Sequence, residues 1–380
     1  MVNSKTFILV AFSFISVLSF CTLKKLPDVN SFGVLASKSK TTPTIVYISN
    51  ADSREIYVLE LNKRDGSLKL IEKEPVNGSV MPLAISPDHK YLYASLRSKP
   101  YAVSSFAIDP HTGKLEWIKT VPLTDNMAYI STDHTGHYLF GASYFGNKIS
   151  VNAIGQDGVI DSIPLQVLQT GKNAHAILTD PSNRYMFVPN LGDDVILQYR
   201  FDERTGKVTV NQPSSVAVKK GAGPRHLVFN PNGHDAFGVN ELDGTLNKYQ
   251  LNESGLLKLV LSYSVMPAGF KGRPAAADIH LRPDGKFIYV SERSSNTIAA
   301  FRINKKKSNL TLVGSYPTET QPRGFNIDPE GKYLLAVGQQ SNGLTVYRID
   351  HKKGTLIKRS QLSIGKNPNW VEILQLTLIN

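Results

Sequence analysis

The stretch GAGPRHLVFNPNGHDAFGVNEL at residues 221–242 contains the unit on which the rest of the chain is patterned. It begins with a turn that contains Gly and Pro, followed by the basic pair Arg225 and His226 at the start of a short apolar strand. A second turn separates that strand from another one, which ends at Glu241. Short apolar runs between Gly, Pro and Asn turns are typical of β-strands. The unit therefore predicts a pair of strands with ionisable side chains at their ends.

The second turn and the strand after it recur at regular intervals. In chain order the copies are ISPDHKYLYAS from Ile85, ISTDHTGHYLFGA from Ile130, LTDPSNRYMFVP from Leu178, FNPNGHDAFGV from Phe229, LRPDGKFIYVS from Leu281 and IDPEGKYLLAV from Ile327. They are spaced by about 48 residues, a period typical of a four-stranded propeller blade. No segment shows a sustained helical period, so the sequence predicts an all-β protein.

The two ends of the chain complete the repeat. Each copy continues into a third strand, a turn and a fourth strand, as in YRFDERTGKV from Tyr199. An earlier copy, beginning with the strand Ile45–Ser49, lacks an inner strand, and KNPNWVEIL from Lys366 supplies the missing one. We therefore predict a seven-bladed β-propeller with four-stranded antiparallel blades, closed by pairing N- and C-terminal strands in one blade. A β-sandwich or two small β domains are the alternatives, and the even spacing disfavours them.

The amino terminus has a different pattern. Residues 1–40 are predicted to be a signal peptide, or a membrane or lipid anchor, with a linker, and 41–380 to be the propeller. The apolar run Thr6–Phe20 has the proportions of a signal-peptide core. Lipidation at Cys21, cleavage after Ala36 and an uncleaved anchor all stay open. We expect a periplasmic or membrane-anchored protein, or a cytoplasmic one if the segment is an artefact of the assigned start.

Composition narrows the class of partner. The net charge of +12 fits a ligand with phosphate or carboxylate groups, and it equally fits a solvated basic surface. The basic residues are scattered, with no Arg-rich helix, so we expect no nucleic-acid partner. A P-loop, a GxGxxG motif and paired cysteines are absent from the sequence, which predicts no cofactor and no metal. The single cysteine excludes an intramolecular disulfide. We expect a monomer that binds a small anionic substrate.

The ionisable residues at the strand ends should converge, because the inner strands of all blades line one axial channel. Glu241 and Arg293 follow second strands, which end near the mouth where the inner strands begin. Several guanidinium groups with few carboxylates favour a phosphate or carboxylate ligand, since buried like charges need compensation. The residues that open the inner strands and carry this chemistry are His175, Arg225, His226, Asp278, His280 and Arg323.

Each candidate also has a purely structural interpretation. His175 and His280 fit as packing residues, and Arg225 fits as a clamp that bonds the carbonyl groups of an adjacent blade. Asp278 fits as a brace for a loop or another side chain. Trp370 fits either a stacking role or closure of the last blade. Glu241 has the weakest structural explanation, because an acid at this position gains nothing from strand propensity.

These residues also carry a resemblance to a known family. GAGPRH at Gly221, VNEL at Val239, AADIH at Ala276 and TETQPRGFNID at Thr318 resemble the bacterial propeller-type 6-phosphogluconolactonases. The similarity extends from about Pro43 to Trp370. The family is related to the carboxymuconate cyclases, which make or open lactones of dicarboxylic acids. The motifs are therefore more specific for the family than for the substrate.

The resemblance implies a carboxylic ester hydrolase of glucose metabolism. The implied reaction is hydrolysis of 6-phospho-D-glucono-1,5-lactone to 6-phosphogluconate in the pentose phosphate pathway, without metal or cofactor. Residue by residue, the implied catalytic set is His175, Arg225, Glu241 and Arg293, with Arg323 as the alternative to Arg293. Beside this set, we predict from the strand ends that His226, His280, Arg323 and Asp278 bind the substrate.

We expect the mechanism to use activated water. Glu241 or His175 acts as general base, and Arg225 stabilises the oxyanion. Arg293 and Arg323 bind the phosphate, helped by His226 or His280. No Ser in a GxSxG context is present to act as nucleophile. Two other functions stay open: an exported interaction module without activity, and a lactonase or cyclase that acts on another anionic lactone.

Overall fold

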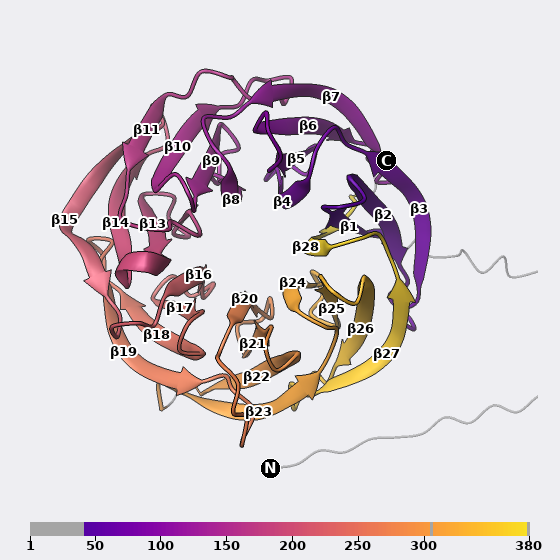
Figure 1. Cartoon of the computed structure of the whole chain (residues 1–380), viewed down its shortest axis with the longest axis vertical. Coiled ribbons are helices and arrows are strands. Elements are labelled where there is room, and N and C mark those ends of the chain that lie inside the picture. The colour runs from indigo at the N-terminus through magenta and orange to yellow at the C-terminus, as the bar shows by residue number, and fades with distance from the viewer. Residues whose placement is uncertain (1–41, 305–306, 378–380) are drawn as a thin grey trace, which may run out of the picture. The chain divides into compact units, whose positions relative to one another are not determined.

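The computed structural model describes residues 42–304 and 307–377. These residues form seven four-stranded antiparallel sheets arranged as blades around a central axis (Figure 1). The predicted all-β, seven-bladed architecture is therefore confirmed. Apart from the two-residue strand Leu178–Thr179, the inner strands pack against those of neighbouring blades, so the inner strands and their openings line the channel at the axis.

The blades follow one another around the ring in chain order. From the axis outward, blade one contains β28 (Pro368–Gln375), β1 (Thr44–Asn50), β2 (Glu55–Leu61) and β3 (Leu68–Pro75); blade two contains β4 (Val80–Ile85), β5 (Tyr91–Leu96), β6 (Ala102–Ile108) and β7 (Leu115–Pro122). Blade three contains β8 (Met127–Thr132), β9 (Tyr138–Ser143), β10 (Lys148–Ala153) and β11 (Gln166–Gln169); blade four contains β12 (Leu178–Thr179), β13 (Tyr185–Asn190), β14 (Val195–Asp202) and β15 (Lys207–Ala217). Blade five contains β16 (Pro224–Phe229), β17 (Asp235–Asn240), β18 (Thr245–Leu251) and β19 (Leu257–Ser264); blade six contains β20 (Ala276–Leu281), β21 (Phe287–Glu292), β22 (Thr297–Asn304) and β23 (Asn309–Pro317); and blade seven contains β24 (Pro322–Ile327), β25 (Tyr333–Gly338), β26 (Gly343–Ile349) and β27 (Leu356–Ser363). We number these blades one to seven.

Blade one closes the ring with strands from both ends of the chain. The inner strand β28 pairs antiparallel with β1, so that Tyr47 lies opposite Glu372 and Ile48 opposite Val371. The predicted closure by KNPNWVEIL is thus confirmed. Because the last strand is held inside a sheet made mostly from the first strands, no inner sheet edge is left open in this blade.

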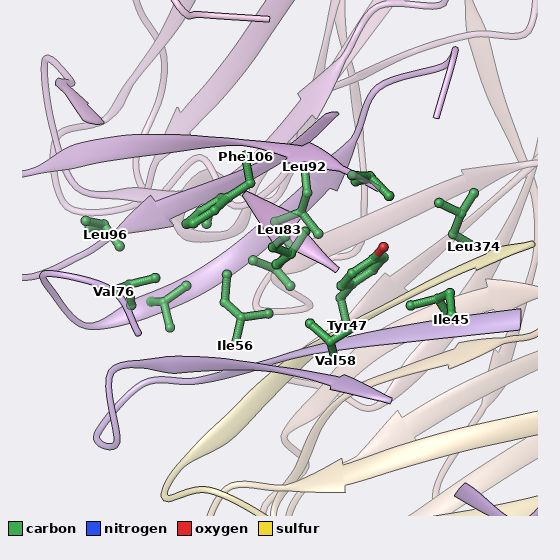
Figure 2. Close-up of a cluster of buried hydrophobic side chains, with 14 of the residues drawn as sticks. Ile45, Tyr47, Ile56, Val58, Val76, Leu83, Leu92, Leu96, Phe106 and Leu374 are labelled. Carbon is green, nitrogen blue, oxygen red and sulfur yellow. The ribbon is translucent and has the colours of Figure 1, made fainter. Parts of the chain in front are cut away.

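The apolar core lies between the blades. In Figure 2, Tyr47 and Val58 of blade one pack against Leu83 and Phe106 of blade two. The hydroxyl group of Tyr47 donates a hydrogen bond to the carbonyl oxygen of Gly113, 2.8 Å away in the next blade. Each blade is covered by a neighbour on both faces, which explains why the central strands are apolar on both sides. This packing holds the strand ends in fixed positions around the axis.

A β-bulge at the opening of the inner strands positions the functional side chains. In β16 the register shifts between Pro224 and His226, and in β24 between Pro322 and Gly324. Bulges re-aim the side chain of the extra residue. In blade four, His175 lies between an isolated bridge at Ala174 and the short strand β12. From blade one to blade seven, leaving out blade four, the residues at the shifts are Asn369, Met81 and Pro82, Ala128, Arg225, Ala277 and Asp278, and Arg323.

The bulge of blade seven provides a test of the fold. A Cβ atom on Gly324 would lie 2.4 Å from the carbonyl oxygen of Asn369 in β28. We expect Gly324→Ala to reduce the free energy of unfolding by about 1–3 kcal/mol, because rigid backbone must move. Thermal unfolding measures the loss. Gly314→Ala is the matched control, because the nearest atom there is the hydroxyl oxygen of Tyr316 at 3.1 Å, which can move. Equal stability of the two variants would contradict the close contact of β24 with β28.

The predictions for residues 1–40, including lipidation at Cys21 and cleavage after Ala36, lie outside the described residues. The segment from Thr42 onward forms one compact unit. In the part of the chain that the structure describes, no helix has the length and apolar character needed to span a membrane.

Candidate active site

The residues that follow the second strands occupy equivalent positions around the mouth of the channel. The backbone N–H of Glu241 bonds the carbonyl of Gly223, and that of Arg293 bonds the carbonyl of Ala275, each just before an inner strand. Arg97 repeats this bond with Ser79. The repeated backbone geometry brings residues that are far apart in sequence to one rim. From blade one to blade seven they are Ala51, Arg97, Tyr144, Leu191, Glu241, Arg293 and Gln339.

Glu241 lies between two guanidinium groups. Its Oε2 is 2.9 Å from Nε of Arg225, and its Oε1 is 3.0 Å from Nη2 of Arg293. The Nε–H of Arg225 does not point along the line to the carboxylate, so we treat this contact as an ion pair and not as a hydrogen bond. About a fifth of the Glu241 side chain (19%) is exposed, which leaves the carboxylate accessible from the mouth.

The pKa of Glu241 follows from this pairing. Burial alone would raise the pKa, but the positive charges of Arg225 and Arg293 outweigh it and keep the pKa below its ordinary value. The group is therefore an ionised carboxylate at neutral pH. Charge pairing also keeps it from being neutralised by protonation in mild acid.

Arg225 serves the site and the blade interface together. Its side chain is 1% exposed, and Nη1 donates to the carbonyl oxygen of Ala277 at the opening of blade six. Nη1 also lies 3.2 Å from Nε2 of His226. The clamp predicted as a structural alternative is thus present, in the same side chain that holds Glu241.

His175 is a neutral, buried imidazole beside these groups. Its ring centroid is 5.2 Å from that of His226 and 5.5 Å from that of Tyr144. Burial, and then the charge of Arg225, hold the pKa of His175 well below 6.5. Its Nδ1 is buried and has no hydrogen-bond partner among the described residues. The ring can therefore accept a hydrogen bond from a ligand or from a water molecule that it orients.

Asp278 holds two histidines with its two carboxylate oxygens. Oδ1 is 2.8 Å from Nδ1 of His226, and Oδ2 is 3.2 Å from Nε2 of His280. Burial and the charge of Arg225 lower the pKa of His226 to about 4, so this ring is neutral. Nδ1–H then donates to Asp278, and Nε2 accepts from Arg225. As a structural alternative, we predicted that Asp278 braces another side chain, and its contacts with His226 and His280 support that role. Held by Asp278, His226 is in position to orient Arg225.

Deeper in the channel, Glu372 is a further titratable group that we did not predict from the sequence. Nε1 of Trp370 donates to Oε1 of Glu372 at 2.8 Å, and burial raises the pKa of Glu372 to about 7. The ring of Trp370 also packs edge-on against Tyr129, with centroids 5.2 Å apart. For His280, burial lowers the pKa, but the carboxylate of Asp278 outweighs this and the pKa is raised. Glu372 lies two residues after Trp370 in KNPNWVEIL, and residues two apart on a strand face the same side. This spacing could have identified Glu372 from the sequence.

The structure also places Arg97 and Tyr144 at the mouth, and both were missed. They directly follow β5 and β9, just as Glu241 and Arg293 follow their second strands. Burial, and then the negative charge of Glu241, raise the pKa of Tyr144, which therefore lies in the field of that carboxylate. For blades five and six we inferred that the residue directly after the second strand lies at the mouth. The same inference for blades two and three would have identified both residues.

A separate surface hollow lies away from the residues of the channel mouth. A surface hollow of about 760 Å³ is lined by Lys63, Glu330 and Arg348, among others, at the turns where inner strands end. Lys63 pairs with Glu330 there at 2.6 Å, so part of its charge is compensated locally. In the described residues, no group of three His, Cys, Asp or Glu side chains is arranged to hold a metal ion.

Together, these features define a β-propeller whose axial mouth combines arginines, the neutral imidazoles of His175 and His226 and the accessible ionised carboxylate of Glu241, an arrangement suited to acid–base chemistry on an anionic ligand. The family model "Lactonase, 7-bladed beta-propeller" matches residues 41–373. The chain belongs to this family of lactonases and is an enzyme of the lactone-hydrolysing kind.

Individual relatives agree with this assignment. The 6-phosphogluconolactonase of Pectobacterium carotovorum subsp. carotovorum is 39% identical over 333 residues, which cover 87% of this chain and 99% of the relative. The 6-phosphogluconolactonase of Serratia proteamaculans is 39% identical over 331 residues, covering 87% and 98%. Among solved structures, the periplasmic gluconolactonase of Pseudomonas aeruginosa is similar with a TM-score of 0.83 and 25% identity, over 88% of this chain and 100% of that one.

Proposed function

We propose that this enzyme hydrolyses 6-phospho-D-glucono-1,5-lactone to 6-phosphogluconate, the lactonase step of the pentose phosphate pathway. One observation carries the proposal: an ionised, accessible carboxylate, Glu241, lies between Arg225 and Arg293 in a mouth rich in positive charge. The names of the bacterial relatives support the choice of lactone.

In the proposed mechanism, Glu241 is the general base. It takes a proton from water as the water oxygen attacks the lactone carbonyl carbon. Arg225 stabilises the oxyanion that forms on the carbonyl oxygen. The bond from this carbon to the ring oxygen then breaks, and the ring oxygen leaves as a hydroxyl group after receiving the proton from Glu241. Atoms and charges balance without a covalent intermediate on the protein.

The other residues have supporting tasks. Arg293 keeps Glu241 ionised and oriented, and Nε of Arg293 is itself held by the carbonyl oxygen of Ala275 at 3.0 Å. His175 accepts a hydrogen bond from the attacking water, because its ring is neutral. His175 is also the alternative base. Arg323 contacts the phosphate, and His226 and Asp278 orient Arg225.

The pH dependence tests the base. Glu241 and His175 both have lowered pKa values, so their unprotonated forms persist below pH 4.5 and 6.5 respectively. After subtraction of spontaneous hydrolysis, we expect kcat/KM of the Glu372→Gln variant for glucono-1,5-lactone, which carries no titrating phosphate, to change by no more than about twofold between pH 5.5 and 7.5. The substitution removes Glu372, whose pKa burial raises to about 7. An acid limb near pH 6.5 in this variant would instead indicate a histidine with an ordinary pKa as the base.

The activity itself is measured with freshly generated lactone. The full chain is mixed with 6-phosphogluconolactone, and acid release is compared with the spontaneous rate and with the rate for glucono-1,5-lactone. We expect acceleration of both reactions and a higher kcat/KM for the phosphorylated lactone. A higher kcat/KM for glucono-1,5-lactone would transfer the proposal to unphosphorylated lactones.

Hydrolysis of unphosphorylated lactones, the second candidate function, has its own support. The apolar run Thr6–Phe20 supports export of this chain, and the relative from Pseudomonas aeruginosa is named as a periplasmic gluconolactonase. An exported enzyme would meet unphosphorylated sugar lactones. Reporter fusions after residue 40 test export, because only a translocated fusion of a phosphatase reporter is active.

A further inference from the structure

The four arginines at the mouth are not equally engaged. Arg225 and Arg293 each contact an oxygen of Glu241, and each donates to a backbone carbonyl. Arg323, the bulge residue of blade seven, is half-buried and has no hydrogen-bond or ion-pair partner among the described residues. A guanidinium group has five N–H donors in a planar fork. Arg323 is thus free to bind an anion, whereas Arg225 and Arg293 are largely committed.

Arg97 is the second arginine with free donors. Its Nε donates to Oδ1 of Asn126, and its Nη1 lies 3.4 Å from Sδ of Met81, the bulge residue of blade two. These contacts hold the half-buried side chain above the inner strand of its blade and leave Nη2 without a protein partner in the described residues. Asn126 also donates to the carbonyl oxygen of Arg97 at 3.5 Å, which fixes the two residues together.

Blade one separates these two arginines and carries the short side chains Ala51 and Asn369 at its rim and bulge positions. Arg323 belongs to blade seven and Arg97 to blade two, and the inner strand β28 lies between β24 and β4 (Figure 1). Blade one carries Ala51 at the position where blade five carries Glu241. Its bulge residue, Asn369, is fully buried and bonds the carbonyl oxygen of Asn367 at 3.0 Å. Neither of these two positions therefore places a charged side chain between the two guanidinium groups.

Neither Arg97 nor Arg323 has an ion-pair partner in the part of the chain that the structure describes. Burial, and then the positive charges of Arg225, Arg293 and Arg97, lower the pKa of Arg323. Arginine stays protonated in proteins, so the lowered pKa reflects first the cost of burying the charge and then the crowding of positive charge around it. Glu241 compensates on the far side of the mouth, where it is shared by Arg225 and Arg293. A doubly charged anion between Arg97 and Arg323 would relieve the crowding.

We propose that Arg97 and Arg323 form an anion subsite that binds the phosphate group of the substrate and selects phosphorylated over unphosphorylated lactones. The proposal rests on the proposed lactonase function of the same mouth and extends it to Arg97. In the six-membered lactone, the carbonyl carbon and the carbon that carries the phosphorylated exocyclic group flank the ring oxygen, and their substituents point away from each other, so two neighbouring parts of the mouth can hold them. Blades five and six then hold the carbonyl, and blades seven and two hold the phosphate.

The test is the specificity of Arg97→Gln. We expect kcat/KM for 6-phosphogluconolactone to fall by about 10-fold or more relative to kcat/KM for glucono-1,5-lactone, mainly through KM, as expected for loss of one charged hydrogen bond. Arg97→Lys should retain part of the preference, since a point charge remains. Arg204→Gln is the control, because this exposed arginine lies on a turn at the opposite end of its blade. Matching melting temperatures show that the variants fold.

Equal losses on the two lactones would overturn the proposal, because Arg97 would then support the site in general. An unchanged preference would overturn it as well. Calorimetric titration with 6-phosphogluconate and with gluconate separates this result from failure of the proposed function. If the wild-type chain hydrolyses neither lactone but binds 6-phosphogluconate more tightly than gluconate, and Arg97→Gln removes the difference, the subsite stands and the hydrolysis is wrong. Equal binding of both acids by the wild-type chain would refute the subsite.

Discussion

Glu241→Gln lowers kcat for lactone hydrolysis by about 10²–10⁴-fold in our account, the range that a general base contributes. The substitution keeps the size of the side chain but removes the group that accepts the proton from water. It also leaves Arg225 and Arg293 without their shared counterion, so KM for an anionic lactone is expected to fall or stay constant while kcat falls. Steady-state kinetics with the spontaneous rate subtracted measure both parameters.

Two controls make this result specific. Glu253→Gln changes an exposed glutamate on a turn at the opposite end of blade five and should keep full activity. The melting temperature of Glu241→Gln shows whether the propeller is intact. A folded Glu241→Gln variant that retains more than about a tenth of the wild-type kcat would exclude Glu241 as the base. His175 would then be the next candidate, and His175→Gln should show the larger loss.

The second large effect is expected for Arg225→Gln. Loss of the oxyanion-stabilising group should lower kcat by about 10²–10³-fold. The side chain is fully buried and also contacts Glu241, Ala277 and His226, so the variant should lose about 3 kcal/mol of folding free energy as well. Kinetics below the melting temperature of the variant and thermal unfolding measure the two effects separately.

Arg282→Gln is a matched control for this double effect. Arg282 is also 1% exposed, and its Nε donates to Oδ1 of Asp284 at 2.9 Å, at the opposite end of blade six. We expect a comparable loss of stability with kcat retained. If Arg225→Gln lowers kcat no more than Arg282→Gln does, Arg225 is only a clamp between the blades, and its proposed role with the oxyanion is wrong.

The fold could be predicted from the sequence because its unit is local and repeated. Each copy, such as ISPDHKYLYAS from Ile85, contains its own turn and strand pattern, so the period is readable without long-range information. Ring closure could also be predicted, because KNPNWVEIL from Lys366 matches the inner strands of other copies while the first copy lacks one. The short inner strand β12, with its separate bridge at Ala174, departs from the expected regular unit, and so does the four-residue outer strand β11.

The site could be predicted only in outline. Strand ends indicated that Arg225, Glu241 and Arg293 gather at the mouth, because a propeller brings equivalent ends together. The pairing among them depends on distances between blades, which the repeat does not encode. The bond of His226 to Asp278, for example, joins blades five and six at 2.8 Å. Arg97 and Tyr144 lie in copies without charged motifs at the inner strand, so nothing in their local sequence indicated a role.

A crystal structure of the full chain with bound 6-phosphogluconate tests the central claim most directly. This product carries a carboxylate where the lactone carbonyl was and keeps the phosphate. We expect the molecule at the axial mouth, with its carboxylate within hydrogen-bond distance of Arg225 and its phosphate between Arg323 and Arg97. Binding in the hollow beside Lys63 and Arg348, or at the mouth without contact to Arg225, would contradict the account.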